Sequence, residues 1–506
     1  MANKRQALAG IDIGTSGAKS VLIDQDGNLL AWAGQEYPLD APHPDWAEQN
    51  PRVWLDAAQN TLRKCLQESD LAPDQVAAIG LTGQMHSLVC LDESGAPLRP
   101  AIIWADRRSR LQVEELTRRF GRQNLAAWTG NPLATGFMLA SWAWLCQEEA
   151  QTAARTRWLI LPKDEVRYRM TGQIGSEPSD ASSTLLFDPH RRTWSQPVLD
   201  QVGLTLDRLP PVHESAEVAG GLLPGFANAC GLLSGTPVVY GCSDQTAQAL
   251  SQGVIQPGLV SCTIGTGGQV FAPAAEPLHD PDLRLHLFCH ALPGMWHLES
   301  AILSAGLALR WLRDQLWPGS NYNELADEAA GVEAAVDGLF FLPYLAGERT
   351  PHMDSSVRAA FSGLSLQHTR ANMVRAAMEG VVFALKQGLE LMLGLGIPLE
   401  RLVVSGGGTR HPLWLQLQAD IFGRPVYPSQ AAEATGRGAA LLAGIGAGIF
   451  KDAREAVDRT VQPGQAPTLP RPEAVEHYAK AYQRFCALYP ALKAAGFAGN
   501  GSTSKP

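Results

Sequence analysis

Runs of apolar residues alternate with segments of helical spacing along most of the chain. Val76–Leu81 and Leu402–Val404 are continuous apolar runs, which are typical of buried strands. In Trp54–Glu68 apolar residues recur every three or four positions, the pattern of a helix with one buried face. Ala371–Leu393 and Pro412–Phe422 predict further helices in the second half. Because strands alternate with helices, the pattern predicts an α/β fold.

Shorter elements are predicted from the same patterns. Ser87–Asp92 and Pro237–Tyr240 each predict a strand. The segment Gly241–Asp244 predicts a turn and Gln245–Gln252 a helix. Ala301–Leu316 also has the spacing of a helix. These elements place Asp244 where a turn meets a helix.

A weak internal repeat is the most informative pattern in the chain. Residues 10–24 are GIDIGTSGAKSVLID, and residues 261–271 are SCTIGTGGQVF. Each copy predicts two strands joined by a tight glycine turn, where the backbone can approach a ligand closely. The N–H groups of such a turn and its threonine hydroxyl are donors for an anion. Each copy predicts a phosphate-binding hairpin.

Two common nucleotide-binding motifs are excluded. In Gly14–Ser20 the spacing between glycine and lysine differs from that of a Walker loop. A strand pattern, rather than a helix, follows each glycine turn, which excludes a Rossmann fingerprint. Either copy alone is also compatible with an ordinary hairpin. Because two copies lie half a chain apart, we predict two related domains that present their hairpins to a shared cleft.

Composition narrows the class of protein. The 506 residues, enough for two or three domains, are 45% hydrophobic and 18% charged. A formal net charge of −9 without a basic run argues against nucleic acid as a partner. Eight scattered cysteines without a CxxC pair indicate reduced thiols rather than disulfides or a zinc site. With no signal-peptide pattern or membrane-spanning stretch, we expect a cytoplasmic protein with no membrane partner.

Two aspartates are candidates for the chemistry. Asp12 precedes the first glycine turn, where a carboxylate is compatible with phosphate only through a divalent cation, most simply Mg²⁺ held through water. Lys19 either offsets phosphate charge or is an ordinary surface lysine. Asp244 is either a helix N-cap or a general base that takes the proton of a hydroxyl during phosphoryl transfer.

A second group of polar residues follows the strand at Val76–Leu81. Gln84, Met85 and His86 are expected at its cleft end, where α/β folds bind ligands. Gln84 and His86 would hydrogen-bond a polyol and Met85 would form an apolar wall, although His86 is also compatible with a bonded loop histidine. Trp104 and Asp106 could add a stacking face and an acceptor, or Asp106 could pair with a neighbouring arginine at the surface.

Taken in series, the motifs resemble those of the FGGY carbohydrate kinases, and within them most closely those of the xylulokinases. The matching segments run in family order over residues 8–450. They are GIDIGTSGAKSVLID (10–24), DWAEQNPRVW (45–54), LTGQMHSLVCLD (81–92), RPAIIWADRRS (99–109), LPKDEVRYRMTG (161–172), GERTPHMD (347–354), GLSLQHTRANMVRAAMEGV (363–381) and VVSGGGTRHPLW (403–414).

The resemblance implies a fold and an activity. The fold would be two actin-like (ribonuclease-H-like) α/β domains with an ATP and sugar cleft between them. An N-terminal sugar-binding domain would cover residues 1–253, an ATP-binding domain 254–495, and a flexible tail 496–506. The activity would be ATP- and Mg²⁺-dependent phosphorylation of a ketopentose, D-xylulose to D-xylulose 5-phosphate. Ribulokinase, glycerol kinase, gluconokinase and a non-catalytic actin-fold nucleotide-binding protein remain alternatives, and a homodimer stays open.

The resemblance also assigns roles to residues. Asp244 would be the catalytic base, and Asp12 the carboxylate near Mg²⁺. Gln245 follows the base where many xylulokinases have asparagine and glycerol kinases have glutamine, so the exact polyol is open. The sugar contacts would be Gln84, Met85, His86, Trp104, Asp106 and Gln245. The ATP and phosphate contacts would be Thr15, Ser16, Gly17, Lys19, Gly265, Thr266, Gly267, Gly306, Gly407 and Gly408.

Overall fold

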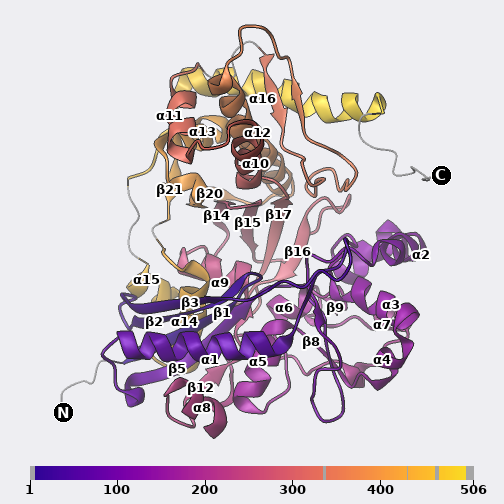
Figure 1. The fold of residues 1–506 in the computed structure, drawn as a ribbon, viewed down its shortest axis with the longest axis vertical. Helices are drawn as coiled ribbons and strands as arrows, with labels where there is room; N and C mark the ends of the chain where they lie inside the picture. Colours follow the sequence, from indigo (N-terminus) through magenta and orange to yellow (C-terminus); the bar gives the residue numbers. More distant parts are fainter. Residues whose placement is uncertain (1–5, 334–337, 430, 462–465, 497–506) are drawn as a thin grey trace.

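The computed structural model describes residues 6–333, 338–429, 431–461 and 466–496 (Figure 1). It contains two large sheets, one in each half of the chain, with helices packed on them. This arrangement confirms the predicted α/β class. Apart from Gly496, the predicted tail at 496–506 lies outside the described residues.

The N-terminal sheet has the strand order β11-β12-β5-β1-β2-β3, and β13 also pairs with β5. β1 is antiparallel to β2 and parallel to β5. α1 packs on β2 and β3. The bounds are β1 (Ala7–Ile13), β2 (Gly17–Asp24), β3 (Leu29–Glu36), β5 (Val76–Gly83), β11 (Val218–Gly221), β12 (Pro237–Val239), β13 (Cys242–Ser243) and α1 (Pro51–Glu68).

The C-terminal sheet repeats this core. Its order is β16-β17-β15-β14-β20-β21, and β14 is antiparallel to β15 and parallel to β20. The predicted duplication of a glycine hairpin is therefore confirmed. The bounds are β14 (Gly258–Ile264), β15 (Gly268–Ala274), β16 (His286–Cys289), β17 (Trp296–Ile302), β20 (Leu399–Gly406), β21 (Val426–Pro428), α10 (Gly306–Leu316), α11 (Tyr322–Ala330), α12 (Arg370–Gly394), α13 (Pro412–Phe422) and α16 (Pro472–Ala494).

Two helices late in the sequence return to the N-terminal sheet. α14 (Ala434–Gly446) packs on β1, β5 and α9, and α15 (Ala453–Thr460) follows it into the lower half of Figure 1. The contact is close, because a Cβ placed on Gly10 would lie 1.8 Å from the carbonyl oxygen of Gly436. Glycine at position 10 thus lets α14 lie directly on β1. The predicted domain boundary at 253/254 stays a prediction. It does not describe the packing completely, because α14 and α15 follow it in sequence but α14 packs on the N-terminal sheet.

Two predicted elements are wrong. Gly241–Asp244 is not a turn: Cys242 and Ser243 form β13, and α9 (Asp244–Ser251) begins at the aspartate. Ala301–Leu316 is not one helix, because Ala301 and Ile302 end β17 by pairing with β15, and α10 begins only at Gly306. In both places pairing with a distant strand overrides the local pattern.

The other predicted helices and strands are present, with small shifts at their ends. The remaining elements are β4 (Glu48–Gln49), β6 (Val89–Leu91), β7 (Ala101–Ile102), α2 (Arg110–Thr129), α3 (Met138–Glu148), α4 (Ala150–Arg155), β8 (Trp158–Ile160), α5 (Pro162–Thr171), α6 (Pro178–Ser182), β9 (Phe187–Asp188), β10 (Thr193–Trp194), α7 (Gln196–Val202), α8 (Pro224–Cys230), β18 (Phe340–Leu342) and β19 (Ala360–Ser362).

β16 joins the two halves. The side-chain amide of Asn131 donates to the carbonyl of Leu287 (2.7 Å) and accepts from its N–H (3.0 Å). The N–H of Cys289 donates to the hydroxyl of Ser182 (3.0 Å). Because Asn131 and Ser182 belong to the N-terminal half, the β16 edge of the C-terminal sheet lies against that half.

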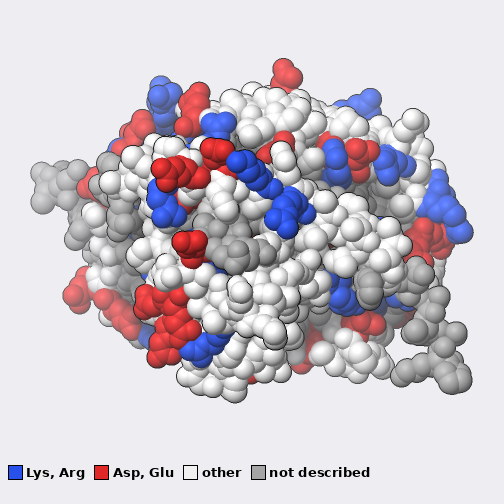
Figure 2. Space-filling view, turned by 90° about the horizontal axis from the view of Figure 1, so that it is seen from above, with Lys and Arg blue, Asp and Glu red and all other residues white. Residues whose placement is uncertain are grey.

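The surface has no strongly charged face in the view from above. Lys and Arg side chains lie among Asp and Glu there (Figure 2), so the described residues of that face form no continuous basic tract. None of the described helices combines the length and apolar composition that crossing a membrane requires.

Candidate active site

The first glycine turn is held by side chains of the N-terminal half. Within the turn, the N–H of Gly14 donates to the carbonyl of Gly17 (3.1 Å). The hydroxyl of Tyr37 donates to the carbonyl of Gly14 (2.5 Å), and the amide of Gln49 donates to the carbonyl of Thr15 (2.7 Å). These bonds fix the turn between β1 and β2 before any ligand binds.

The second glycine turn is held by backbone instead. The N–H of Gly306, at the start of α10, donates to the carbonyl of Gly265 (2.8 Å). The N–H groups of Ala305 and Leu307 both donate to the carbonyl of Thr266 (3.0 Å each). A Cβ on Gly306 would lie 2.5 Å from the Gly265 oxygen, so this contact needs glycine.

A third glycine segment lies against the same strand end. A Cβ on Gly408 would lie 2.7 Å from the Cβ of Ile264, the residue before Gly265. Gly265, Thr266, Gly306 and Gly408, which the resemblance assigns to ATP, are therefore neighbours. Their contact with a nucleotide stays a prediction.

Asp12 stands at the end of β1, directly opposite Lys19 on β2. The hydroxyl of Thr435, on α14, donates to Asp12 Oδ2 (2.5 Å). Asp12 Oδ1 is buried and has no hydrogen-bond partner among the described residues. Burial raises the pKa of Asp12, and the Thr435 hydrogen bond and the charge of Lys19 oppose that rise. One carboxylate oxygen thus remains available for a ligand.

Asp244 is the first residue of α9, and Ser243 takes the N-cap position. β13 pairs in parallel with the end of β5, which sets Ser243 opposite Gly83. Asp244 Oδ1 is buried without a hydrogen-bond partner in the described part of the chain. Burial, followed by the charges of Asp12 and Glu299, raises the pKa of Asp244 to about 8. The N-cap alternative is therefore not realised, and the carboxylate has the properties of a base.

A buried ionic cluster supports the segment before Asp244. The ammonium group of Lys163 donates to the carbonyl of Tyr240 (3.2 Å) and to Asp164 Oδ1 (2.9 Å), and it pairs with Asp180 Oδ2 (3.4 Å). The hydroxyl of Ser179 accepts a hydrogen bond from the N–H of Ser243 (2.9 Å). Sequence analysis missed this cluster, whose members are brought together by folding.

The two aspartates fit a divalent cation. Each has one buried oxygen without a hydrogen-bond partner among the described residues, and the charge of Asp12 raises the pKa of Asp244. Mg²⁺ prefers such carboxylate oxygens and completes its shell with water and phosphate. Within the described residues no group of three or more His, Cys, Asp or Glu could hold a metal ion. A cation here would need phosphate or water as further ligands.

His86 has a defined orientation. Its Nδ1 lies 2.9 Å from the carbonyl oxygen of Ser183, which can only accept, so Nδ1 carries the proton and Nε2 is an acceptor. Its ring lies 4.0 Å from that of Phe137. Burial lowers the pKa of His86 to about 3, which keeps the ring neutral. Met85, beside it, is buried.

The other predicted sugar residues differ in what they contact. Gln84 donates to Gln49 Oε1 (2.9 Å) behind the first turn, and Trp104 donates from Nε1 to the hydroxyl of Thr15 (2.7 Å). Gln245 forms hydrogen bonds to Asp244 that oppose the rise of its pKa. Both oxygens of Asp106 accept hydrogen bonds from Arg108. The alternative predicted for Asp106, an ion pair with a neighbouring arginine, is thus present but buried rather than at the surface, and a sugar contact by Asp106 stays a prediction.

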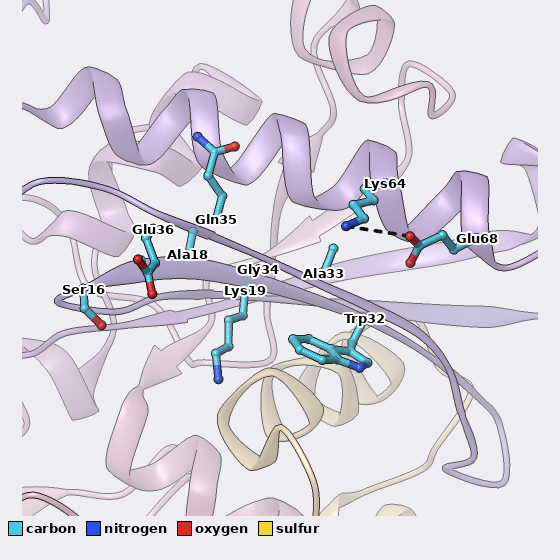
Figure 3. Close-up of a pocket in the computed structure, with 11 residues that line it drawn as sticks. Ser16, Ala18, Lys19, Trp32, Ala33, Gly34, Gln35, Glu36, Lys64 and Glu68 are labelled. Carbon is cyan, nitrogen blue, oxygen red and sulfur yellow. Dashed lines mark ion pairs between the residues drawn. The ribbon is translucent and has the colours of Figure 1, made fainter. Parts of the chain in front are cut away.

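Lys19 is occupied by an ion pair. Its Nζ lies 2.9 Å from Glu433 Oε2, and half of the Lys19 side chain is exposed. A cavity of about 550 Å³ opens beside it (Figure 3). Lys19 and Trp32 lie on one side of the hairpin β2–β3 there, and Lys64 and Glu68 on the α1 side. Ser16 and Gly17 of the first turn also line this cavity, whereas Asp12 and Asp244 do not.

Comparison with known proteins identifies the family. The model of the FGGY family of carbohydrate kinases, N-terminal domain, matches residues 7–251, and that of the C-terminal domain matches residues 260–447. The chain belongs to the FGGY family of carbohydrate kinases.

Relatives of this FGGY kinase include proteins with different sugars. It is 34% identical to the xylulose kinase of Bacillus subtilis (strain 168), over 95% of this chain and 96% of that protein. A xyloylose kinase from Brucella ovis is 34% identical, with a TM-score of 0.90 over 97% of this chain and all of the other (100%). A gluconate kinase from Lactobacillus acidophilus is 26% identical, with a TM-score of 0.92 over 96% and 98% of the two chains. The resemblance to xylulokinases and the two-domain fold are confirmed.

The C-terminal half of this FGGY kinase adds polar residues that sequence analysis missed. They are Gln269 of β15, His286 of β16 and Glu299 of β17. Arg349 joins them, because the N–H of the next residue, Thr350, donates to the carbonyl of Ala301 on β17 (3.1 Å). The charge of Glu299 acts on Asp244, and that of Arg349 acts on both His86 and Glu299. The only signal for Glu299 is an acidic residue inside the apolar strand WHLESAI.

Proposed function

We propose that the protein phosphorylates D-xylulose at O5 with ATP and Mg²⁺, and that Asp244 is the general base. Full-length similarity to xylulose kinases supports the substrate. The observation that carries the proposal is the Asp244 carboxylate, with its raised pKa, beside Asp12. A base with a pKa near the working pH takes up a proton readily without being fully protonated beforehand.

The two glycine turns would bind the nucleotide's phosphates. Thr15, Gly17 and Thr266 contribute hydroxyl and backbone donors, which suit an anion. Asp12 would hold Mg²⁺ through water, and Mg²⁺, when bound, neutralises charge on the transferring phosphoryl group. The remaining ATP contacts would come from the glycines around Gly306 and Gly408.

The sugar would lie between the turns and His86. His86 Nε2 would accept a hydrogen bond from a sugar hydroxyl, and Met85 would pack against its carbon chain. Asp244 would accept the proton of the O5 hydroxyl as that oxygen forms its bond to the γ-phosphorus and the bond to the leaving ADP oxygen breaks. Closure of the two halves would exclude water, a competing nucleophile.

A coupled assay of ADP release tests the proposal. D-xylulose, D-ribulose, glycerol and gluconate are each given as acceptor with Mg²⁺ and ATP. We expect the highest kcat/KM with D-xylulose and turnover that depends on the sugar. Preference for another acceptor would contradict the substrate, and ADP release that is indifferent to sugar would contradict the kinase activity. Gluconate is the main competitor, because a gluconate kinase has a closely similar fold.

A further inference from the structure

One face of the C-terminal sheet looks toward the proposed sugar site. On β17, Glu299 is paired with Phe271 of β15 and with His286 of β16. Paired residues in adjacent strands point to the same face of a sheet, as do residues two apart. His286 and Phe288 therefore share this face, and their rings lie 5.8 Å from Phe137 and 5.9 Å from His86 respectively. Glu299 faces the N-terminal half.

Glu299 has an oxygen that the protein does not satisfy. Its side chain is buried, with 6% of the residue exposed. Oε1 accepts a hydrogen bond from the amide of Gln269 (3.0 Å). Oε2 is buried and has no partner among the described residues. Since a buried carboxylate oxygen without a donor costs free energy, this atom is a ready acceptor for a ligand hydroxyl.

His286 presents a second acceptor on the same face. Its Nδ1 lies 3.1 Å from Asn131 Oδ1, an oxygen that also accepts from the N–H of Leu287. Nδ1 therefore carries the proton, and Nε2 has only a lone pair. This Nε2 is also buried without a partner in the described part of the chain. Glu299 Oε2 and His286 Nε2 on this face, together with Nε2 of His86 in the N-terminal half, are all hydrogen-bond acceptors. A ligand with several hydroxyl donors would satisfy them.

Charge around Glu299 opposes an anionic ligand. Its charge, with that of Asp12, acts on Asp244, so two carboxylates lie near the base. Arg349 is the main cation beside Glu299, but Glu348 flanks the same guanidinium. Two glutamates, Glu299 and Glu348, therefore act on the Arg349 guanidinium.

We propose that Glu299, with His286, binds the hydroxyls of a neutral sugar and disfavours a sugar acid such as gluconate. This inference rests on the proposed kinase function and adds a selectivity residue from the C-terminal half. A carboxylate accepts hydrogen bonds from hydroxyls but cannot donate one to another carboxylate. The same acceptor would therefore strengthen binding of a ketopentose and repel an aldonate.

The test compares Glu299→Gln with a matched variant. Glu165→Gln also removes a buried carboxylate with one unpartnered oxygen, but Glu165 pairs with Arg169 on α5, outside the sugar site. ADP release is measured with D-xylulose and with gluconate at saturating ATP. In Glu299→Gln we expect KM for D-xylulose to rise on the order of 10- to 100-fold, the range for one charge-assisted hydrogen bond. Gluconate turnover should fall less or increase, and Glu165→Gln should keep the wild-type ratio.

The outcomes separate this inference from the proposed function. If the wild type prefers D-xylulose and Glu299→Gln keeps the ratio of the two kcat/KM values, the inference is overturned and the kinase function stands. If the wild type prefers gluconate, both are overturned. If it prefers another neutral acceptor, that acceptor replaces D-xylulose in the same comparison. Should Glu299→Gln fail to fold, Glu299→Asp keeps the charge but withdraws the acceptor by one methylene, and the same rise in KM for D-xylulose is expected.

Discussion

The hairpin β1–β2 and the hairpin β14–β15 share their strand pairing but carry different residues beside their turns. In the first, Asp12 stands opposite Lys19. In the second, Thr263 stands opposite Gln269. The hydroxyl of Thr263 accepts from Gln248 (2.6 Å) and lies 2.8 Å from that of Ser405. The position that holds an open carboxylate in one half is a satisfied neutral group in the other.

This difference indicates that the two hairpins have different functions. A glycine turn supplies donors for phosphate in either half, because that property depends on backbone. Of the two turns, which both lie in the described part of the chain, only the first has a carboxylate at this position, and the charge of that carboxylate, Asp12, acts on Asp244 more strongly than that of Glu299 on β17. We infer that the duplicated backbone binds anions twice, while cation and proton chemistry belong to the N-terminal half.

The largest expected effect is that of Asp244→Asn. Loss of the base should lower kcat by about 10²–10⁴-fold. Stability should not fall, because a carboxylate whose pKa is raised in the fold opposes folding when ionised. Steady-state ADP release, thermal unfolding and calorimetric binding of D-xylulose check this. Activity within tenfold of wild type, which is less loss than the roughly 10²-fold lower end for base catalysis, would show that another residue is the base.

The next effect separates the two hairpins directly. Asp12→Asn should raise the Mg²⁺ concentration for half-maximal activity on the order of 10- to 100-fold, as expected for a group that orients a metal's water ligands. Thr263→Val, the matched change in the second hairpin, should leave the Mg²⁺ dependence unchanged. A Mg²⁺ titration at fixed ATP measures both. If the Mg²⁺ concentration for half-maximal activity rises equally in the two variants, the two hairpins do not differ in cation binding.

A smaller effect is expected in the pH profile. Asp244 acts ionised, and its pKa is raised to about 8, first by burial and then by Asp12. The kcat/KM for D-xylulose should therefore fall about tenfold per unit below that pH and level off above it. Asp12→Asn removes one charge that raises this pKa, so its acid limb should move to lower pH. If the acid limb of the pH profile does not move in Asp12→Asn, the charge of Asp12 does not raise the pKa of Asp244.

The smallest effect is expected at Lys19. Its ion pair with Glu433 is half exposed on the lysine side, and such pairs contribute about 0–1 kcal/mol. Lys19→Met should therefore change KM for ATP by less than about fivefold, if the lysine mainly holds Glu433. A much larger rise in that KM, with stability unchanged, would instead make Lys19 a phosphate ligand.

Local sequence was enough to predict the two hairpins. Each lies within a short stretch in which Ile-Gly-Thr sits between apolar runs, and pairing of such neighbours needs no distant partner. Asp12 and Asp244 could be singled out because each adjoins a predicted strand or helix end. Their surroundings could not: Thr435, which bonds Asp12, is 423 positions away.

The polar wall of the C-terminal half was missed for the same reason. Glu299 and His286 sit in apolar strands, and only the pairing of β16 with β17 sets them side by side. The prediction that a helix begins at Ala301 was wrong for the same reason, because pairing with β15 extends β17 to Ile302. The buried pair of Asp106 was not predicted either, because sequence does not show that Arg108 folds back onto both its oxygens.

The most direct test of the account is a crystal structure with D-xylulose and a non-hydrolysable ATP analogue. We expect the triphosphate between the turns at Gly14 and Gly265, and the O5 hydroxyl within hydrogen-bond reach of Asp244, about 2.6–3.2 Å. A triphosphate that contacts only one turn, or a sugar whose O5 lies away from Asp244, would contradict it.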